Sequence, residues 1–164
     1  MITLTIPGDP IGKARPRFVR KTGHTFTPDK TVNYETLIRE LFAVKYPDHQ
    51  PMTGPVWMEV VAHMRIPSSK SKKVKTAMID GLVFPTVKPD ADNLLKVFAD
   101  AMNGLAYMDD KQIVSASVSK RYSERPRAEV EVKEYTEEDF NVNPQPCNDG
   151  KQGVGLAKEE DDDE

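Results

Sequence analysis

The sequence predicts an α+β fold in which a small mixed β-sheet packs with about two main helices. Three observations predict it. Short segments at the start of the chain, in its middle and between residues 113 and 135 alternate polar and apolar residues with the period of half-buried strands. Two longer segments repeat their apolar residues at three- and four-residue steps, as amphipathic helices do. The resulting order of strand, helix, strand, helix, strand, strand is typical of a small α+β domain.

The first half of the chain supplies two strands and one helix. Residues 1–6 alternate threonine with isoleucine and leucine, which predicts a first strand, and residues 8–20 form a loop rich in glycine, proline and cations. Residues 28–46 carry apolar side chains at helical spacing, with Thr27 as the expected N-cap. Residues 55–66 alternate again and predict a strand with two different faces.

The second half begins with a basic segment and a helix. Residues 68–78 contain four lysines and predict a short basic helix, and residues 81–89 predict a loop. The clearest helix is residues 92–103, for which Asp92 is the expected N-cap and Gly104 the expected left-handed residue after the end.

Two strands follow this helix. Residues 113–122 and 128–135 both alternate, and the short link that contains Pro126 predicts an antiparallel hairpin between them. The pattern is lost after residue 135, where too little apolar surface remains to offset the entropy of ordering. We therefore expect one domain over residues 1–135 and a disordered acidic tail over residues 136–164.

Charge is segregated along the chain. Residues 1–133 hold 21 lysines and arginines against 15 acidic residues, a net charge of +6, whereas residues 134–164 hold 2 against 11, a net charge of −9. A basic body favours a polyanionic partner, although ordinary surface charge explains +6 equally well. One cysteine allows no internal disulfide, and no apolar run approaches the ~20 residues that span a bilayer, so we expect a cytoplasmic protein without a membrane segment.

Acidic residues concentrate around the clearest helix. Four of the five carboxylates between residues 90 and 110 form two close pairs, Asp90 with Asp92 and Asp109 with Asp110. Carboxylate oxygens are hard ligands that suit Mg²⁺, and a bound Mg²⁺ can activate water for attack on a phosphate. Lys96 lies one helical turn after Asp92 and can stabilise charge that develops during such a reaction.

Structural roles explain the same residues without any chemistry. Asp92 can act as an N-cap alone, and Asp90 can be a loop residue that caps a turn. Lys96 can pair with Asp92 or Asp100 one turn away, and the Asp109–Asp110 pair can belong to a turn. Residue spacing alone leaves the metal site and these structural roles open.

The segment KPDADNLLKVFADAMNGLAYMDDKQIV, residues 88–114, resembles the RusA family of Holliday-junction resolvases, in particular its prophage-type members. The family pattern is Asp-x-Asp-Asn, a lysine four residues after the second aspartate, and Asp-Asp-x-Gln-Val before a strand. The matching residues are Asp90, Asp92, Asn93, Lys96, Asp109, Asp110 and Gln112, with Ile113 in place of the valine. The loop GKARPRF, residues 12–18, is also similar, and the resemblance extends over about residues 1–135.

The resemblance implies a RusA-like homodimer that acts as a crossover junction endodeoxyribonuclease. Such an enzyme uses Mg²⁺ to resolve four-way junction DNA by paired symmetric nicks in DNA recombination and repair. It implies that Asp90, Asp92 and Asp110 are metal ligands and Lys96 a catalytic cation, while the role of Asp109 stays open. The alternative is a non-catalytic basic DNA-binding or architectural protein, and a partner-binding protein with a recruiting tail is a third hypothesis.

Three groups of cations are candidates for contact with the DNA backbone, because phosphate contacts position DNA without reading its sequence. They are Lys13, Arg15 and Arg17; Lys70, Lys72, Lys73 and Lys75; and Arg121 with Arg125 and Arg127. Two aromatic residues, Phe84 and Tyr107, flank the acidic segment. We expect both to pack in the core, and stacking on an unpaired base is the alternative.

Overall fold

The structure is a computed structural model that describes residues 1–15, 17–19, 24–26 and 28–136, without the side chains of residues 17–19 and 24–26. The acidic tail expected for residues 136–164 therefore lies, apart from Thr136, outside the described residues. No helix in the described ranges is long and apolar enough to cross a membrane.

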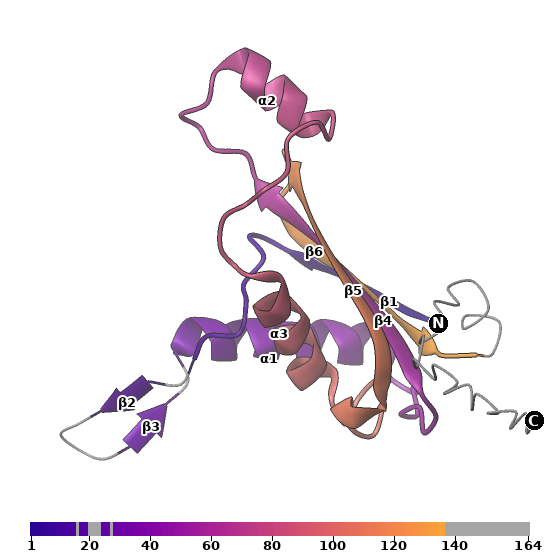
Figure 1. Cartoon of the computed structure of the whole chain (residues 1–164). Helices are drawn as coiled ribbons and strands as arrows, with labels where there is room; N and C mark the ends of the chain where they lie inside the picture. The colour runs from indigo at the N-terminus through magenta and orange to yellow at the C-terminus, as the bar shows by residue number, and fades with distance from the viewer. Residues whose placement is uncertain (16, 20–23, 27, 137–164) are drawn as a thin grey trace, which may run out of the picture.

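Four strands form one mixed sheet (Figure 1). They are β1 (Ile2–Pro7), β4 (Val56–Arg65), β5 (Ile113–Ser123) and β6 (Arg127–Glu134). The order across the sheet is β1-β6-β4-β5, in which β4 and β5 are parallel and the other neighbours antiparallel. The predicted α+β class with a mixed sheet is confirmed.

The predicted hairpin between the last two strands is wrong, because β4 lies between β5 and β6 and pairs with both. The link of residues 124–126 therefore crosses the end of β4. Two strand spacings are about 9.6 Å, and three extended residues span about 10 Å, so the link is just long enough. A short link between antiparallel strands thus fits either arrangement, and only the pairing with β4 distinguishes them.

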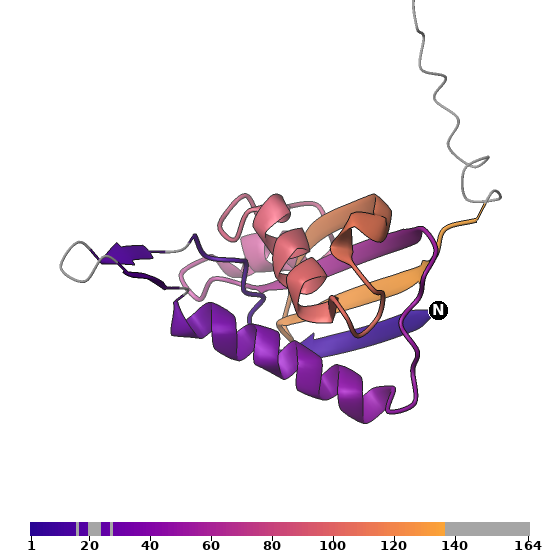
Figure 2. The same cartoon turned by 90° about the horizontal axis from the view of Figure 1, so that it is seen from below.

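Two helices cover one face of the sheet, α1 (Asp29–Lys45) and α3 (Ala91–Met102) (Figure 2). The core lies between these helices and the inward side chains of β1, β4 and β6. Both expected N-caps are wrong. Pro28 precedes α1 in place of Thr27, which lies outside the described residues, and Asp90 rather than Asp92 precedes α3. Gly104 has the positive φ of +74° that was expected after α3.

The short basic helix is confirmed as α2 (Lys72–Ile79), which lies beyond the end of the sheet and away from α1 and α3 (Figure 1). The predicted loop over residues 8–20 is interrupted by β2 (Arg17–Val19), which pairs antiparallel with β3 (His24–Phe26). A 3₁₀ turn, η1 (Asp110–Gln112), precedes β5.

Candidate active site

The acidic residues of α3 lie on the solvent side of a helix that the core holds firmly. Leu94, Val97 and Phe98 are fully buried, whereas Asp92 and Lys96 are exposed. This helix therefore has a fixed position and presents its charged side chains to solvent. Burial of that apolar face supplies the stability that exposed charges do not.

Asp90 is exposed and precedes α3 in an extended conformation, with φ −73° and ψ 153°. Its side chain makes no capping hydrogen bond, so its carboxylate oxygens remain available for another ligand. Lys120 on β5 fixes the chain just before it, because its Nζ donates to the carbonyl oxygens of Val87 at 2.7 Å and Pro89 at 3.1 Å. The sequence shows no local signal for this contact, since Lys120 is one residue of an alternating strand.

The N-terminal loop packs directly on the start of α3. The backbone N–H of Lys13 donates to the carbonyl oxygen of Asn93 at 2.8 Å. A Cβ atom on Gly12 would lie 2.8 Å from Cβ of Pro89 and 3.0 Å from Cβ of Asn93. Glycine is therefore required at position 12 for this close approach, and the loop restrains the segment that carries Asp90.

Lys13 joins this loop to both main helices. Its Nζ lies 2.6 Å from Oε1 of Glu35 on α1 and 2.8 Å from Oδ2 of Asp100 on α3. Burial favours the neutral amine, but the hydrogen bonds and charges of the two carboxylates outweigh it and raise the pKa of Lys13. Lys13 thus connects the N-terminal loop with α1 and α3, and its predicted contact with DNA stays a prediction.

The two adjacent aspartates before β5 have different roles. Asp109 caps η1, because its side chain accepts a hydrogen bond from the backbone N–H of Lys111 at 3.0 Å. Gln112 completes the capping box by accepting from the backbone N–H of Asp109 at 2.8 Å. The bond from the Lys111 backbone is the main reason that the pKa of Asp109 is lowered. Asp110, the next residue, is exposed and has no capping role.

Tyr107 brings the start of η1 against α3. Its side chain is fully buried, as expected, and its hydroxyl donates to the carbonyl oxygen of Ala99 on α3 at 2.9 Å. Burial is the main cause of its raised pKa, and the negative charges of Asp110 and Asp100 add to it. Asp110 and Asp100 therefore both lie close to Tyr107, so the second acidic pair is held beside the helix that carries Asp92 and Lys96.

The structure excludes two of the structural explanations. Asp92 lies in the first turn of α3 and is not its cap residue, and Lys96 forms no ion pair with any described residue. Asp100, the other candidate partner of Lys96, pairs with Lys13. Both adjacent aspartates belong to the turn η1, but only the side chain of Asp109 caps it.

Three carboxylates are not gathered around one point in this structure. Within the described ranges, no three histidine, cysteine, aspartate or glutamate side chains lie close enough to hold a metal ion. The donor chemistry of Asp90, Asp92 and Asp110 suits a hard cation, and all three are exposed. Their assignment as metal ligands stays a prediction.

A cationic hollow of about 730 Å³ lies beside Asp90. Arg15, predicted to contact DNA, lines it, and so do Lys30 and Lys88, which sequence reasoning missed. These residues are distant in the sequence and come together only through packing of the N-terminal loop on α3. The other predicted contacts lie elsewhere: Lys70, Lys72, Lys73 and Lys75 in or just before α2, and exposed Arg121 on β5. The side chain of Arg17 lies outside the described residues.

Comparison with known proteins identifies relatives over most of the chain. Residues 7–133 match the family described as Endodeoxyribonuclease RusA. The chain is also 40% identical over 137 residues to YqaN of Bacillus subtilis (strain 168), a protein named as uncharacterized, and the match covers 81% of this chain and 96% of that protein. Both matches include the segment that carries the acidic pairs.

Proposed function

The chain belongs to the endodeoxyribonuclease RusA family, and on this basis we propose that it resolves four-way DNA junctions by paired, symmetric, Mg²⁺-dependent nicks. One observation carries the chemical part of the proposal. Asp109 caps η1, whereas Asp90, Asp92 and Asp110 are exposed and their side chains make no capping hydrogen bond.

Asp90, Asp92 and Asp110 are the residues that would hold the metal. A bound Mg²⁺ supplies an activated water and neutralises charge on the scissile phosphate. Lys96 has no ion pair with the described residues and lies one turn from Asp92, so we assign it to the charge that develops on the phosphate or on the leaving oxygen. Lys120, Gly12 and Lys13 act as positioning residues, because they fix the segment before α3 and tie the N-terminal loop to it.

The hollow beside Asp90 provides contacts for the DNA backbone. Arg15, Lys30 and Lys88 line it and offer positive charge next to the proposed scissile phosphate. Such contacts hold a phosphate without reading the base, as expected for a nuclease that recognises the branched structure of its DNA substrate.

A four-way junction has two equivalent strands to cut, and a homodimer with twofold symmetry places one active site at each. We therefore propose that the working unit is a dimer. The cytoplasmic location expected from the sequence remains a prediction.

A cleavage assay tests the proposal. The full chain is incubated with a synthetic four-way junction, or with a linear duplex of the same arm sequences, with and without Mg²⁺. The proposal predicts Mg²⁺-dependent nicks at symmetric positions in two opposite strands of the junction, and no cutting of the duplex. Junction binding without any Mg²⁺-dependent nick would instead support the non-catalytic DNA-binding alternative.

A further inference from the structure

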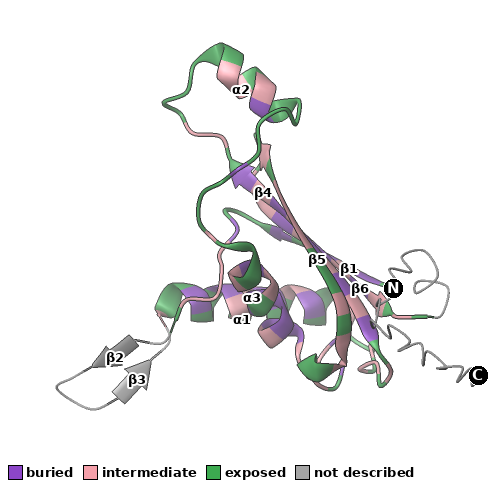
Figure 3. Cartoon of the chain, viewed as in Figure 1, coloured by how far each residue is buried: buried purple, intermediate pink, exposed green. Residues whose placement is uncertain are grey.

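The segment between β4 and α3, residues 66–89, is an arm with an unusual surface. It contains five lysines and one aspartate, a net charge of +4. Apart from buried Met78 and Pro85, its residues are at least partly exposed, and α2 lies beyond the end of the sheet (Figure 3). The arm therefore contributes little to the core, and packing does not account for its sequence.

Large apolar side chains are exposed along the second half of the arm. Leu82 is 75% exposed and Phe84 61%, which makes the expected core position of Phe84 wrong. Among the described residues, half of the exposed large hydrophobic side chains fall within nine positions of the arm, namely Ile79, Leu82, Val83, Phe84 and Val87. Clustered exposed apolar side chains usually mark a surface that binds something.

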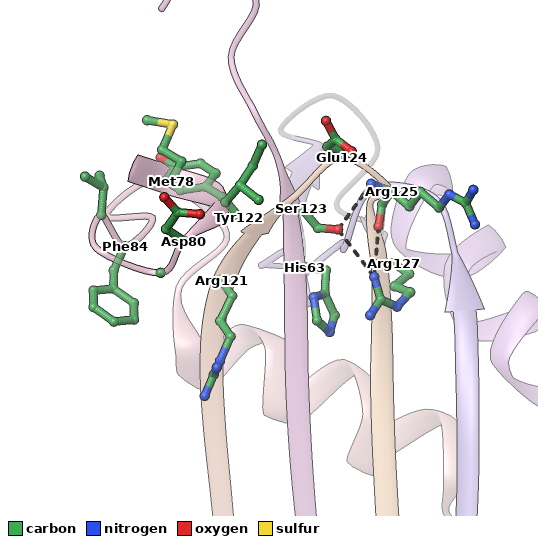
Figure 4. A pocket seen from close by; sticks show the side chains of 13 residues that line it. His63, Met78, Asp80, Phe84, Arg121, Tyr122, Ser123, Glu124, Arg125 and Arg127 are labelled. Atoms are coloured by element: carbon green, nitrogen blue, oxygen red, sulfur yellow. Dashed lines mark hydrogen bonds between the residues drawn. The ribbon is translucent and has the colours of Figure 1, made fainter. Parts of the chain in front are cut away.

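A hollow of about 740 Å³ separates this part of the arm from the ends of β5 and β6 (Figure 4). Met78 and Phe84 line it from the arm and Tyr122 from β5, and two acidic residues, Asp80 and Glu124, line it as well. Arg121 and Arg125 line it from the sheet side, and neither side chain has an ion pair among the described residues. The volume lies in the range of pockets that take small organic groups.

The combination of cations, an aromatic side chain and a hollow matches the chemistry of an unstacked nucleotide. Aromatic side chains stack on bases that are not paired inside a duplex, and cations hold the adjoining phosphates. Regular duplex DNA hides the base faces, whereas a branch point can expose them. Positive charge on the same arm favours a polyanion over a second, largely uncharged apolar surface.

We propose that the arm binds the branch point of junction DNA, with Phe84 and Leu82 against unstacked bases and Lys72 and Lys73 on the flanking phosphates. This inference rests on the proposed function, and it adds a base-contacting surface outside the acidic site. The arm leads directly into Asp90, and Lys120 holds that connection at Val87 and Pro89. DNA bound at the arm would therefore influence where the strand to be cut lies relative to Asp90.

Binding experiments without cleavage test the inference. Affinity of the full chain for a four-way junction and for a duplex is measured in Ca²⁺, with 2-aminopurine at the branch point as a reporter of stacking. We expect Phe84→Ala to weaken junction binding at least about fivefold, the effect of losing one aromatic–base stack. It should also reduce the 2-aminopurine signal change and leave duplex affinity unaltered. Leu82→Ala should have the same pattern with a smaller effect.

The lysines provide an independent test. A double Lys72→Ala, Lys73→Ala variant should weaken junction and duplex binding alike and lower the slope of log affinity against log salt by about 2. Val44→Ala is the matched control, because Val44 is an exposed apolar residue on α1 outside the arm, and it should change nothing.

Several outcomes would overturn the inference. If Phe84→Ala binds the junction as tightly as the parent, and the parent cuts junctions, the arm has no role in binding and the proposed function still stands. A parent chain that binds no DNA overturns both. Loss of self-association in Phe84→Ala, seen by sedimentation, assigns the arm to a second copy, and loss of binding to anionic phospholipid vesicles assigns it to a membrane surface.

Discussion

The segment from Asp90 to Gln112 and the arm before it place their apolar residues in opposite ways. In the first segment, Phe98 and Tyr107 are fully buried and the acidic side chains face solvent. In the arm, Phe84 and Leu82 face solvent. The first pattern holds charged groups at fixed positions, as chemistry requires, and the second offers a contact surface. We therefore expect substitutions in the first segment to change stability or cleavage, and substitutions in the arm to change DNA binding.

The largest expected difference concerns two phenylalanines. Phe98→Ala should lower the free energy of unfolding by about 3–5 kcal/mol, because it leaves a cavity under α3. Phe84→Ala should change it by less than about 0.5 kcal/mol, since an exposed side chain has little packing to lose. Denaturant unfolding measures both. A comparable loss in the two variants would show that the arm belongs to the folding core.

The next effect separates the two adjacent aspartates. Asp110→Asn should lower junction cleavage at least about 100-fold, as the loss of a group that stabilises the reacting charge does. Asp109→Asn should keep most of the activity and lose a little thermal stability, because the asparagine oxygen can still accept the capping bond of η1 but no longer carries the charge that strengthens it. Single-turnover cleavage and thermal unfolding distinguish the variants. If Asp109→Asn lost cleavage and Asp110→Asn kept it, Asp109 rather than Asp110 would be assigned as the metal ligand.

A smaller effect is expected where the N-terminal loop meets α3. Gly12→Ala introduces a Cβ that must displace Pro89 or Asn93, which should cost about 1–3 kcal/mol of stability and reduce cleavage by shifting Asp90. Gly54→Ala is the control, because a Cβ there meets nothing within 4 Å. Equal behaviour of the two variants in unfolding and cleavage would mean that the loop does not position Asp90.

The smallest effect is a pH dependence at Asp109. Its pKa is lowered in the folded state, so its contribution to stability is present above the unfolded pKa of about 3.8 and is lost as the pH falls through the folded value. The stability difference between the parent and Asp109→Asn should therefore shrink as the pH falls from about 5 through the lowered pKa of Asp109. Unfolding curves across this range give the difference, and a constant value would contradict the capping role.

Much of the fold was predictable because alternation and helical spacing report which face is buried. The strands β1, β4, β5 and β6 and the three helices were all expected close to their observed places. The pairing of β5 with β4 was not, because it joins residues such as Trp57 and Ser115 that are far apart in the sequence, and a short link fits two arrangements. The expected N-cap of α3 was wrong because Asp90 and Asp92 are chemically alike and only two residues apart.

Prediction of the candidate site was more limited. The spacing of aspartates in the sequence identified the acidic pairs. Lys120 and Lys30, however, belong to the site region through tertiary packing alone, which no local sequence pattern reports. Phe84 and Tyr107 were indistinguishable as sequence neighbours of the acidic segment. Their burial differs because Tyr107 lies between α3 and η1, whereas Phe84 belongs to a segment with little core contact.

The metal site is tested most directly by Asp90→Asn, measured for junction cleavage in Mg²⁺ and for junction binding. Asp48→Asn is the matched control, since Asp48 is an exposed aspartate in the turn after α1. We expect Asp90→Asn to lose cleavage and to bind the junction as tightly as the parent, while Asp48→Asn retains both. An Asp90→Asn variant that still cuts the junction at near the parent rate would contradict the assignment of Asp90 as a metal ligand.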